Sequence, residues 1–277
     1  MTLAPKSSAI RTNVGESPWT LRWRRTVANE RGNITGPIIF QELDLFSIQL
    51  AEQIVITSMT NSAAASERTR VRRVPQRAVY DRGSIDAILD EALVCHVGLV
   101  NDGQPFVIPT IHWRVGDELF IHGSAASRMI EHGLSGAPLC VTVTLIDGVV
   151  LARSAFHHSM NYRSVVVLGR ARVVTARDEK LAALTALVNR FSPGRSDRVR
   201  APNEQELKAT TLLALPIIEA SAKVRSGGPI DDEADRALPI WAGVIPLRLE
   251  ALPALVAEPR AAGELAPSLG HPFLHVT

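Results

Sequence analysis

Three short apolar segments joined by tight turns constrain the fold of this 277-residue chain more than any other feature. Residues 95–100 are followed by the turn sequence Asn101-Asp102-Gly103-Gln104, and residues 105–114 are then rich in β-branched and aromatic side chains. Gly116-Asp117 forms a second turn before residues 118–122. Strands joined by turns this short pair antiparallel, because a parallel connection needs a dozen or more residues. The sequence therefore predicts a β-meander and no βαβ unit.

The rest of this region predicts further strands with helices at the periphery. A turn is expected at Asp147-Gly148, and Ser84 is the expected N-cap of the first helix. Further strands are expected over residues 137–146, 149–152, 165–174, 215–225 and 242–249, and helices over residues 85–93, 127–135, 178–191 and 204–213. Six or seven strands with hairpin links predict a mainly β, closed or partly closed antiparallel barrel with peripheral helices, in one domain.

The two ends of the chain differ from this central region. We expect residues 1–73 to be a poorly ordered extension, with an amphipathic helix over residues 37–56 and the natural start at Met59. An Arg-rich transit peptide is the alternative, but Glu16 and Glu30 are unusual for one. Residues 74–250 are the expected domain, and residues 251–277, rich in Pro, Ala and Gly, are an expected flexible tail.

Charge and cysteine usage exclude several classes of protein. Residues 1–74 contain ten basic and six acidic residues, so the formal net charge of +2 arises in the extension and the expected domain is slightly acidic. A nucleic-acid partner is not expected, because such domains concentrate Lys and Arg on the folded part. The sequence shows no secretory apolar region and no apolar run long enough to span a membrane, and Cys95 and Cys140 form no disulfide framework. We therefore expect a cytoplasmic protein with no membrane partner.

One strand end carries residues suited to a phosphate. His122-Gly123-Ser124 lies where a predicted strand meets a predicted helix, and Arg128 follows one turn later. Backbone N–H groups, a hydroxyl and a guanidinium at such a point can bind phosphate. The alternative is an ordinary N-cap with a solvated Arg. Short catalytic signatures such as GxGxxG, GxSxG and HExxH are absent from the sequence.

Five segments in order resemble one known family. They are RAVYD at residues 77–81, DGQPFVIP at 102–109, IHGS at 121–124, HSMNYRSV at 158–165 and WAGVIP at 241–246. Over residues 74–249 the chain resembles the pyridoxamine 5'-phosphate oxidase-related flavoproteins, and most of all the branch of the nitroimidazole-resistance reductases. The resemblance implies an FMN-binding split β-barrel that works as a homodimer with the flavin at the subunit interface.

The resemblance also implies which residues bind the cofactor. Ser124 and Arg128 match the phosphate-binding positions, and Trp241 matches an aromatic that approaches the flavin from the partner subunit. Ile108, Pro109 and Thr110 match a strand that runs along the isoalloxazine ring. Tyr162, Arg163 and Ser164 match a segment near the phosphate and ribityl chain. His122 matches a histidine beside the cofactor. Structural roles are the alternatives, with Pro109 ending a strand ladder and Trp241 serving as a core aromatic.

These observations predict an FMN-dependent oxidoreductase that reduces nitro-aromatics or another small-molecule oxidant, with His122 as a proton or hydrogen-bond donor. The alternative is a binding protein for a flavin or for haem that performs no turnover. A metal site formed by His122, His157 and His158 is not expected, because adjacent strand residues point to opposite faces.

Overall fold

The computed structural model describes residues 21–23, 41–43 and 63–255. The chain divides into two compact units, residues 1–60 and 61–277. In the first unit, β1 (Leu21–Trp23) pairs antiparallel with β2 (Gln41–Leu43). The helix predicted over residues 37–56 is therefore wrong at Gln41–Leu43, which form a strand paired with β1. The rest of that helix and the expected start at Met59 lie outside the described residues.

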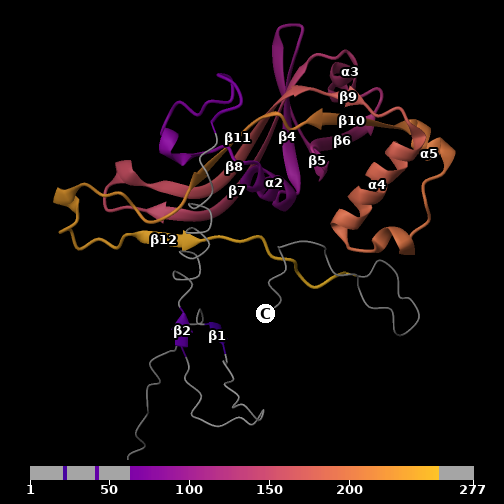
Figure 1. The fold of residues 1–277 in the computed structure, drawn as a ribbon. Coiled ribbons are helices and arrows are strands. Elements are labelled where there is room, and N and C mark those ends of the chain that lie inside the picture. Colours follow the sequence, from indigo (N-terminus) through magenta and orange to yellow (C-terminus); the bar gives the residue numbers. More distant parts are fainter. Residues whose placement is uncertain (1–20, 24–40, 44–62, 256–277) are drawn as a thin grey trace, which may run out of the picture. The chain divides into compact units, whose positions relative to one another are not determined.

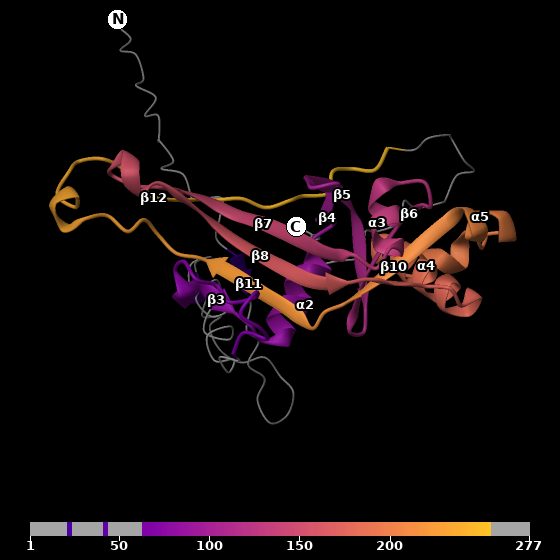
Figure 2. The same ribbon diagram turned by 90° about the horizontal axis from the view of Figure 1, so that it is seen from above.

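The second unit is built on one antiparallel sheet of ten strands (Figure 1), in the order β3-β11-β8-β7-β4-β5-β6-β10-β9, with β12 paired to β7. The strands are β3 (Ala78–Val79), β4 (Val94–Asn101), β5 (Gln104–Val115), β6 (Glu118–Ser124), β7 (Pro138–Leu151), β8 (Ser159–Arg170), β9 (Arg172–Val173), β10 (Thr210–Pro216), β11 (Glu219–Arg225) and β12 (Gly243–Pro246). Figure 2 shows β7, β8 and β11 side by side. The predicted mainly β fold is confirmed, and the sheet is open at β3 and β9.

Strand β5 changes its neighbour halfway along its length. Residues 104–111 pair with β4, whereas residues 112–115 pair with β6. Strand β6 pairs with β10 along its whole length, up to Ser124 opposite Thr210, and so extends beyond its last pair with β5 at Ile121. The first half of β5 therefore has one edge that none of the described strands occupies, which is the split in the barrel.

Four helices surround the sheet: α2 (Arg82–Glu91), α3 (Arg128–Leu134), α4 (Arg177–Phe191) and α5 (Glu204–Ala209). Short 3-10 turns are η1 (Pro75–Arg77), η2 (Ala155–His157), η3 (Arg195–Arg198) and η4 (Glu233–Asp235). The N-cap of α2 is Asp81, whose carboxylate accepts a hydrogen bond from the Ser84 backbone N–H at 2.8 Å. The prediction of Ser84 as N-cap is therefore wrong: the helix begins three residues earlier, and the Asp81 carboxylate accepts the hydrogen bond of a first-turn backbone N–H.

The helices cover two hydrophobic cores. Helix α2 buries Ile85, Ile88 and Leu89 in the larger core, which the inner faces of the strands complete. Helix α4 packs Ala183 and Leu187 on the second core, with Trp113 and Phe120. Since Trp113 and Ile121 face opposite sides of the sheet, β5 and β6 contribute to both cores.

Three predicted boundaries differ from the structure. Strand β7 continues through Asp147-Gly148 with a register shift against β8, because Gly148 packs closely against Val244 and Ile245 of β12. Strand β8 consequently begins at Ser159. Helix α5 ends at Ala209 because Thr210 and the following residues pair with β6, so residues 210–225 form two strands. Within the described residues, none of the helices has the length and apolarity to span a membrane.

Candidate functional site

Ser124 and Arg128 lie at adjoining ends of β6 and α3. Ser124 ends the strand and Arg128 begins the helix, and both side chains are exposed. The turn between them is closed by the Ser127 N–H, which donates to the Ser124 carbonyl at 2.9 Å. The Ser127 hydroxyl oxygen caps α3 by accepting from the Ile130 N–H at 3.3 Å. Ser127, and not Ser124, is therefore the N-cap, which leaves the Ser124 side chain exposed beside Arg128.

Arg128 contacts the first half of β5 through an aromatic ring. Its guanidinium carbon lies 4.0 Å from the centroid of the Phe106 ring. Arg128 has no ion pair with a carboxylate among the described residues. The cation is therefore positioned by stacking and remains available to an anion.

The β5 residues of the predicted flavin site lie on the half of the strand with the unoccupied edge. Ile108, Pro109 and Thr110 pair with β4 on their other edge. Ile108 packs partly against the larger core, as Phe106 does, whereas Pro109 is exposed on the opposite face. Backbone groups along the unoccupied edge can meet the edge of a planar ring.

His122 lies on the face of β6 that points to the second core. Its ring meets the Trp113 ring edge-on, with centroids 5.7 Å apart. Burial lowers the pKa of His122, so the imidazole is neutral at pH 7. The His122 Nδ1 and Trp113 Nε1 atoms are both buried without a hydrogen-bond partner among the described residues. Unpartnered buried polar atoms are uncommon and frequently mark functional sites.

Tyr162, Arg163 and Ser164 lie on β8, which β7 and β4 separate from β5. Measured along the sheet, β8 is three strand spacings of about 4.8 Å, or about 14 Å, from β5. Tyr162 and Ser164 share one face, and the Ser164 hydroxyl donates to the Lys223 carbonyl at 3.3 Å. Among the described residues, no hydrogen bond, ion pair or ring contact joins these three residues to Ser124 or Arg128.

Arg163 points to the opposite face and binds two carboxylates. Its Nη2 donates to Glu91 Oε1 at 2.7 Å and to Asp147 Oδ1 at 2.8 Å, and its Nη1 donates to the other Glu91 oxygen. Burial alone lowers the pKa of Arg163, but its hydrogen bonds to Glu91 and Asp147 outweigh burial and raise it. In this arrangement Arg163 is engaged by protein carboxylates and does not meet a phosphate.

Trp241 lies just before β12 and is 64% exposed. A Cβ added to Gly243 lies 3.0 Å from the Trp241 ring, so the absence of a side chain there lets the indole lie against the backbone. Strand β12 pairs with the far end of β7, at Leu151. Like Tyr162, Trp241 is therefore separated from the β5 group within one chain.

The sequence does not assign a role at the site to Phe106, Glu91 or Asp147. Phe106 lies inside the DGQPFVIP segment, but its contact with Arg128 joins distant parts of the sequence. The Glu91 and Asp147 carboxylates meet Arg163 from α2 and β7. Pairs of this kind are formed by tertiary packing, so the Asp147-Gly148 turn pattern does not reveal that Asp147 binds Arg163, and Glu91 lies in no local motif.

The expectation that His157 and His158 lie on a strand is wrong, because both precede β8. His157 ends η2, and His158 Nδ1 lies 2.9 Å from the Ser154 carbonyl oxygen. His157 Nε2 lies 3.3 Å from Asp232. Across the part of the chain that the structure describes, no group of three His, Cys, Asp or Glu side chains is arranged to hold a metal ion.

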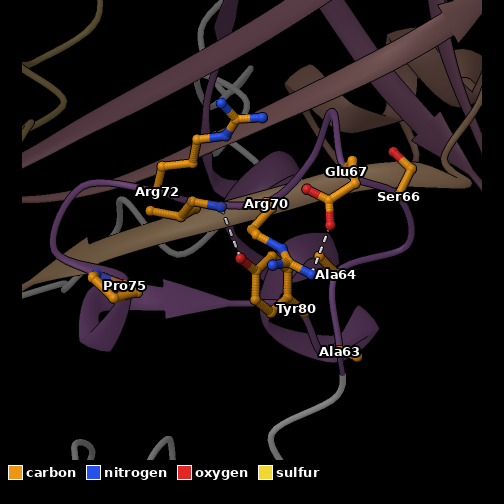
Figure 3. A pocket seen from close by; sticks show the side chains of 9 residues that line it. Ala63, Ala64, Ser66, Glu67, Arg70, Arg72, Pro75 and Tyr80 are labelled. Carbon is orange, nitrogen blue, oxygen red and sulfur yellow. Dashed lines mark hydrogen bonds and ion pairs between the residues drawn. The ribbon is translucent and has the colours of Figure 1, made fainter.

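Two of the cavities formed by described residues of the second unit bear on the site. The larger, of about 800 Å³, lies between residues 63–75 and Tyr80 (Figure 3). There the Tyr80 hydroxyl accepts from the Val71 N–H at 2.9 Å, and Arg70 pairs with Glu67 at 2.7 Å. The smaller, of about 490 Å³, lies between the end of α2 and β7, and Arg163 is part of its lining. Arg163 is the one predicted site residue that lines either cavity.

Comparisons with known proteins identify relatives of the chain. The flavocytochrome Anf3 from Azotobacter vinelandii is 43% identical over 74% of this chain and 95% of its own, with a TM-score of 0.69. An FAD and haem binding protein from Mycobacterium smegmatis is 42% identical over 69% of this chain and 94% of its own, with a TM-score of 0.66. Among curated proteins, none matches the chain.

The family comparison agrees with these two structures. The sequence pattern of the family described as pyridoxamine 5'-phosphate oxidase matches residues 81–224, which run from the cap of α2 almost to the end of β11. The match includes the split in β5 and the Ser124–Arg128 turn. The family predicted from the five sequence segments is thereby confirmed: the chain belongs to the pyridoxamine 5'-phosphate oxidase family.

Proposed function

We propose that the chain binds a flavin nucleotide, with its phosphate at Ser124 and Arg128 and its ring along residues 108–110 of β5. The observation that carries this proposal is the Arg128 guanidinium, which is stacked on Phe106, lacks a carboxylate partner among the described residues and lies beside the unoccupied edge of β5. A hydroxyl and a free guanidinium fit a phosphate well. The relatives above 40% identity, a flavocytochrome and an FAD and haem binding protein, support the same ligand class.

The identity of the flavin is the next part of the proposal. The sequence resemblance implies FMN, whereas the Mycobacterium smegmatis relative is named as binding FAD. A phosphate anchor at Ser124 and Arg128 serves both, because both nucleotides carry a phosphate after the ribityl chain. We favour FAD, since the identity of 42% extends over 69% of the chain. Heat release of the ligand followed by mass spectrometry distinguishes the two, and recovery of FMN alone contradicts this choice.

A homodimer is part of the proposed arrangement. Tyr162, Ser164 and Trp241 lie away from Ser124 and Arg128 within one chain, so a second copy is required if all of them are to contact one flavin. Analytical ultracentrifugation of the flavin-loaded protein is expected to show a dimer. Trp241→Ala is expected to lower flavin affinity without changing the phosphate-binding residues. A monomer that binds flavin as tightly as the dimer contradicts this arrangement.

The proposed activity is reduction of a small-molecule oxidant such as a nitro-aromatic. A bound flavin supplies hydride and electron transfer from a reduced nicotinamide to the oxidant. Ser124 and Arg128 hold the phosphate, the β5 edge orients the ring, and the neutral His122 imidazole donates a hydrogen bond to the bound oxidant. His122→Gln is then expected to lower kcat with little change in flavin content.

The deciding experiment measures bound flavin in the purified full chain. The protein is expected to show flavin absorbance, and the Ser124→Ala and Arg128→Ala variants are each expected to bind flavin about 10- to 100-fold more weakly, since a charge-assisted hydrogen bond contributes about 1.5–3 kcal/mol. Arg198→Ala is the matched control, because Arg198 is an exposed cation on η3, outside both β6 and α3. Unchanged flavin affinity in both site variants contradicts the phosphate assignment.

Haem binding is a second candidate function. The observation that favours it is the buried Nδ1 of His122, which has no partner among the described residues and belongs to a neutral ring. Neutral imidazole nitrogen is a common metal ligand, and the Mycobacterium smegmatis relative is named as binding haem. Haem titration of the purified chain tests this function: a Soret band that shifts in His122→Ala supports it, and a protein that takes up no haem contradicts it.

A further inference from the structure

The smaller cavity lies where β4 and β7 separate. The two strands pair from His96 to Gly98, so they are already apart at Val94. The cavity of about 490 Å³ opens there, between Val94 and residues 144–147 of β7. Residues 247–250, which follow β12, form another wall and are held by the Leu247 N–H, which donates to the Asp147 carbonyl at 3.0 Å.

The charged groups of this cavity are paired with one another. Glu91 and Asp147 both bind Arg163, and Arg248 lies 3.7 Å from Glu250. Three carboxylates thus face two guanidinium groups in the lining. This balance gives an anion no free cation to bind and makes the cavity unfavourable for phosphates and carboxylates.

The remaining lining is apolar, with two free polar groups. Five large side chains keep considerable exposure around the cavity: Leu93 40%, Val94 47%, Ile146 39%, Leu247 46% and Leu249 63%. The His96 ring and the Thr144 hydroxyl form no hydrogen bond or ion pair with the described residues. Exposed apolar side chains that converge on a few unengaged polar groups are typical of small-molecule sites.

We propose that this cavity is a binding site for a small, uncharged ring compound that carries one hydroxyl or carbonyl oxygen. The rings contact Leu93, Ile146 and Leu249, and the oxygen hydrogen-bonds to His96 and Thr144. The volume lies within the range of about 300–1,000 Å³ that small-molecule pockets have. It suits a ligand about the size of two fused rings.

The cavity adjoins the proposed flavin position. His96 lies directly opposite Pro109, and Thr144 directly opposite Ser164, so the side chains of each pair share one face of the sheet. Ser124 and Arg128 do not line the cavity. The proposal therefore does not rest on the phosphate assignment at Ser124 and Arg128, and the two ideas are tested by different ligands.

The test is isothermal titration of the full chain with two probes that share one ring system. 2-Naphthol is uncharged, and 2-naphthoate is an anion at pH 7. We expect 2-naphthol to bind, and 2-naphthoate to bind at least about tenfold more weakly, because the lining carries an excess of carboxylate. Thr144→Val keeps the shape of the side chain and removes the hydroxyl, and it is expected to weaken 2-naphthol about threefold.

A charge placed on the wall provides the matched comparison. Leu249→Asp is expected to weaken 2-naphthol by about tenfold or more, whereas Leu252→Asp, three residues later and outside the lining, leaves it unchanged. Both leucines are more than half exposed, so both variants retain the fold, which circular dichroism checks. The proposal is overturned if neither probe binds, if 2-naphthoate binds as tightly, or if the two Asp variants lose affinity equally. A further result also overturns it. If the protein binds neither probe and Leu249→Asp converts a dimer to monomers, this surface is an interface between two copies of the chain.

Discussion

The guanidinium of Arg128 lies over the ring of Phe106, with 4.0 Å between the guanidinium carbon and the ring centroid. The contact joins the start of α3 to the first half of β5. A free Arg side chain samples many rotamers, and ordering it for a ligand costs up to about 2 kcal/mol. Because Phe106 holds the guanidinium in place beforehand, part of this cost is met in the unliganded protein.

Phe106→Leu is therefore expected to weaken flavin binding although Phe106 itself carries no polar group. The stacking contributes about 0.5–1 kcal/mol at an exposed site, which corresponds to a two- to fivefold loss of affinity. Equilibrium dialysis of the flavin measures it. Phe156→Leu is the control, because Phe156 is 89% exposed at the far end of the β7–β8 hairpin. Equal affinities in the two variants contradict the positioning role.

Arg163→Met is expected to lower the free energy of unfolding by about 2–3 kcal/mol. The substitution leaves Glu91 and Asp147 half-buried without their common partner. Urea unfolding measures the loss, and Arg236→Met, in an exposed pair with Glu233, is expected to cost less than about 0.5 kcal/mol.

A compensating variant tests the cause of that loss. Adding Glu91→Gln and Asp147→Asn to Arg163→Met removes the unpaired charges and is expected to recover part of the stability. If Arg163→Met instead leaves stability unchanged and abolishes flavin binding, Arg163 belongs to the cofactor site, as the sequence resemblance implies.

The hairpins of the sheet are predictable from sequence because their cause is local. Asp102 and Gly103 both adopt positive φ, 50° and 75°, which is what an Asp-Gly hairpin turn requires. Asp147-Gly148 has the same two residue types but lies inside β7. There the Asp147 carboxylate binds Arg163, and Gly148 packs against β12, so distant partners outweigh the local preference.

The candidate site divides in the same way. Ser124 and Arg128 are brought together by one short turn, so their proximity follows from the sequence. The contact of Arg128 with Phe106 and the separation of Tyr162 from β5 depend on strand order, in which β7 and β4 lie between β8 and β5. Strand order is a property of tertiary pairing, and spacing along the chain does not specify it.

The two cysteines are expected to differ in reactivity in the native protein. Burial raises the pKa of Cys95 to about 12 and also raises the pKa of the half-buried Cys140. The thiolate is the reactive form, so both react slowly at pH 8, and Cys95 is expected to be unmodified while Cys140 is labelled partially. Iodoacetamide labelling with peptide mass spectrometry measures this order. Labelling after denaturation in urea is the control, and faster native labelling of Cys95 contradicts the prediction.

His112 is expected to make folding stability depend on pH. The ring is fully buried, and its Nε2 lies 2.9 Å from the Leu89 carbonyl oxygen. Burial, assisted by the nearby Arg190 cation, lowers the pKa of His112 from 6.5 to about 4, against smaller opposing effects of the Leu89 hydrogen bond and Asp90. Because the unfolded chain binds the proton more readily, the stability associated with His112 is complete above about pH 6.5 and declines towards pH 4.

The expected loss between these two pH values is about 3 kcal/mol, and it ends below pH 4, where both states are protonated. His112→Gln retains an N–H that can reach the Leu89 carbonyl but does not titrate. Urea unfolding of both proteins from pH 4 to pH 7 isolates the contribution of His112, since all other groups titrate in both. The stability of the wild-type protein relative to His112→Gln is expected to fall by about 3 kcal/mol as the pH falls from 6.5 to 4. A constant difference across that range contradicts the prediction and assigns His112 a packing role alone.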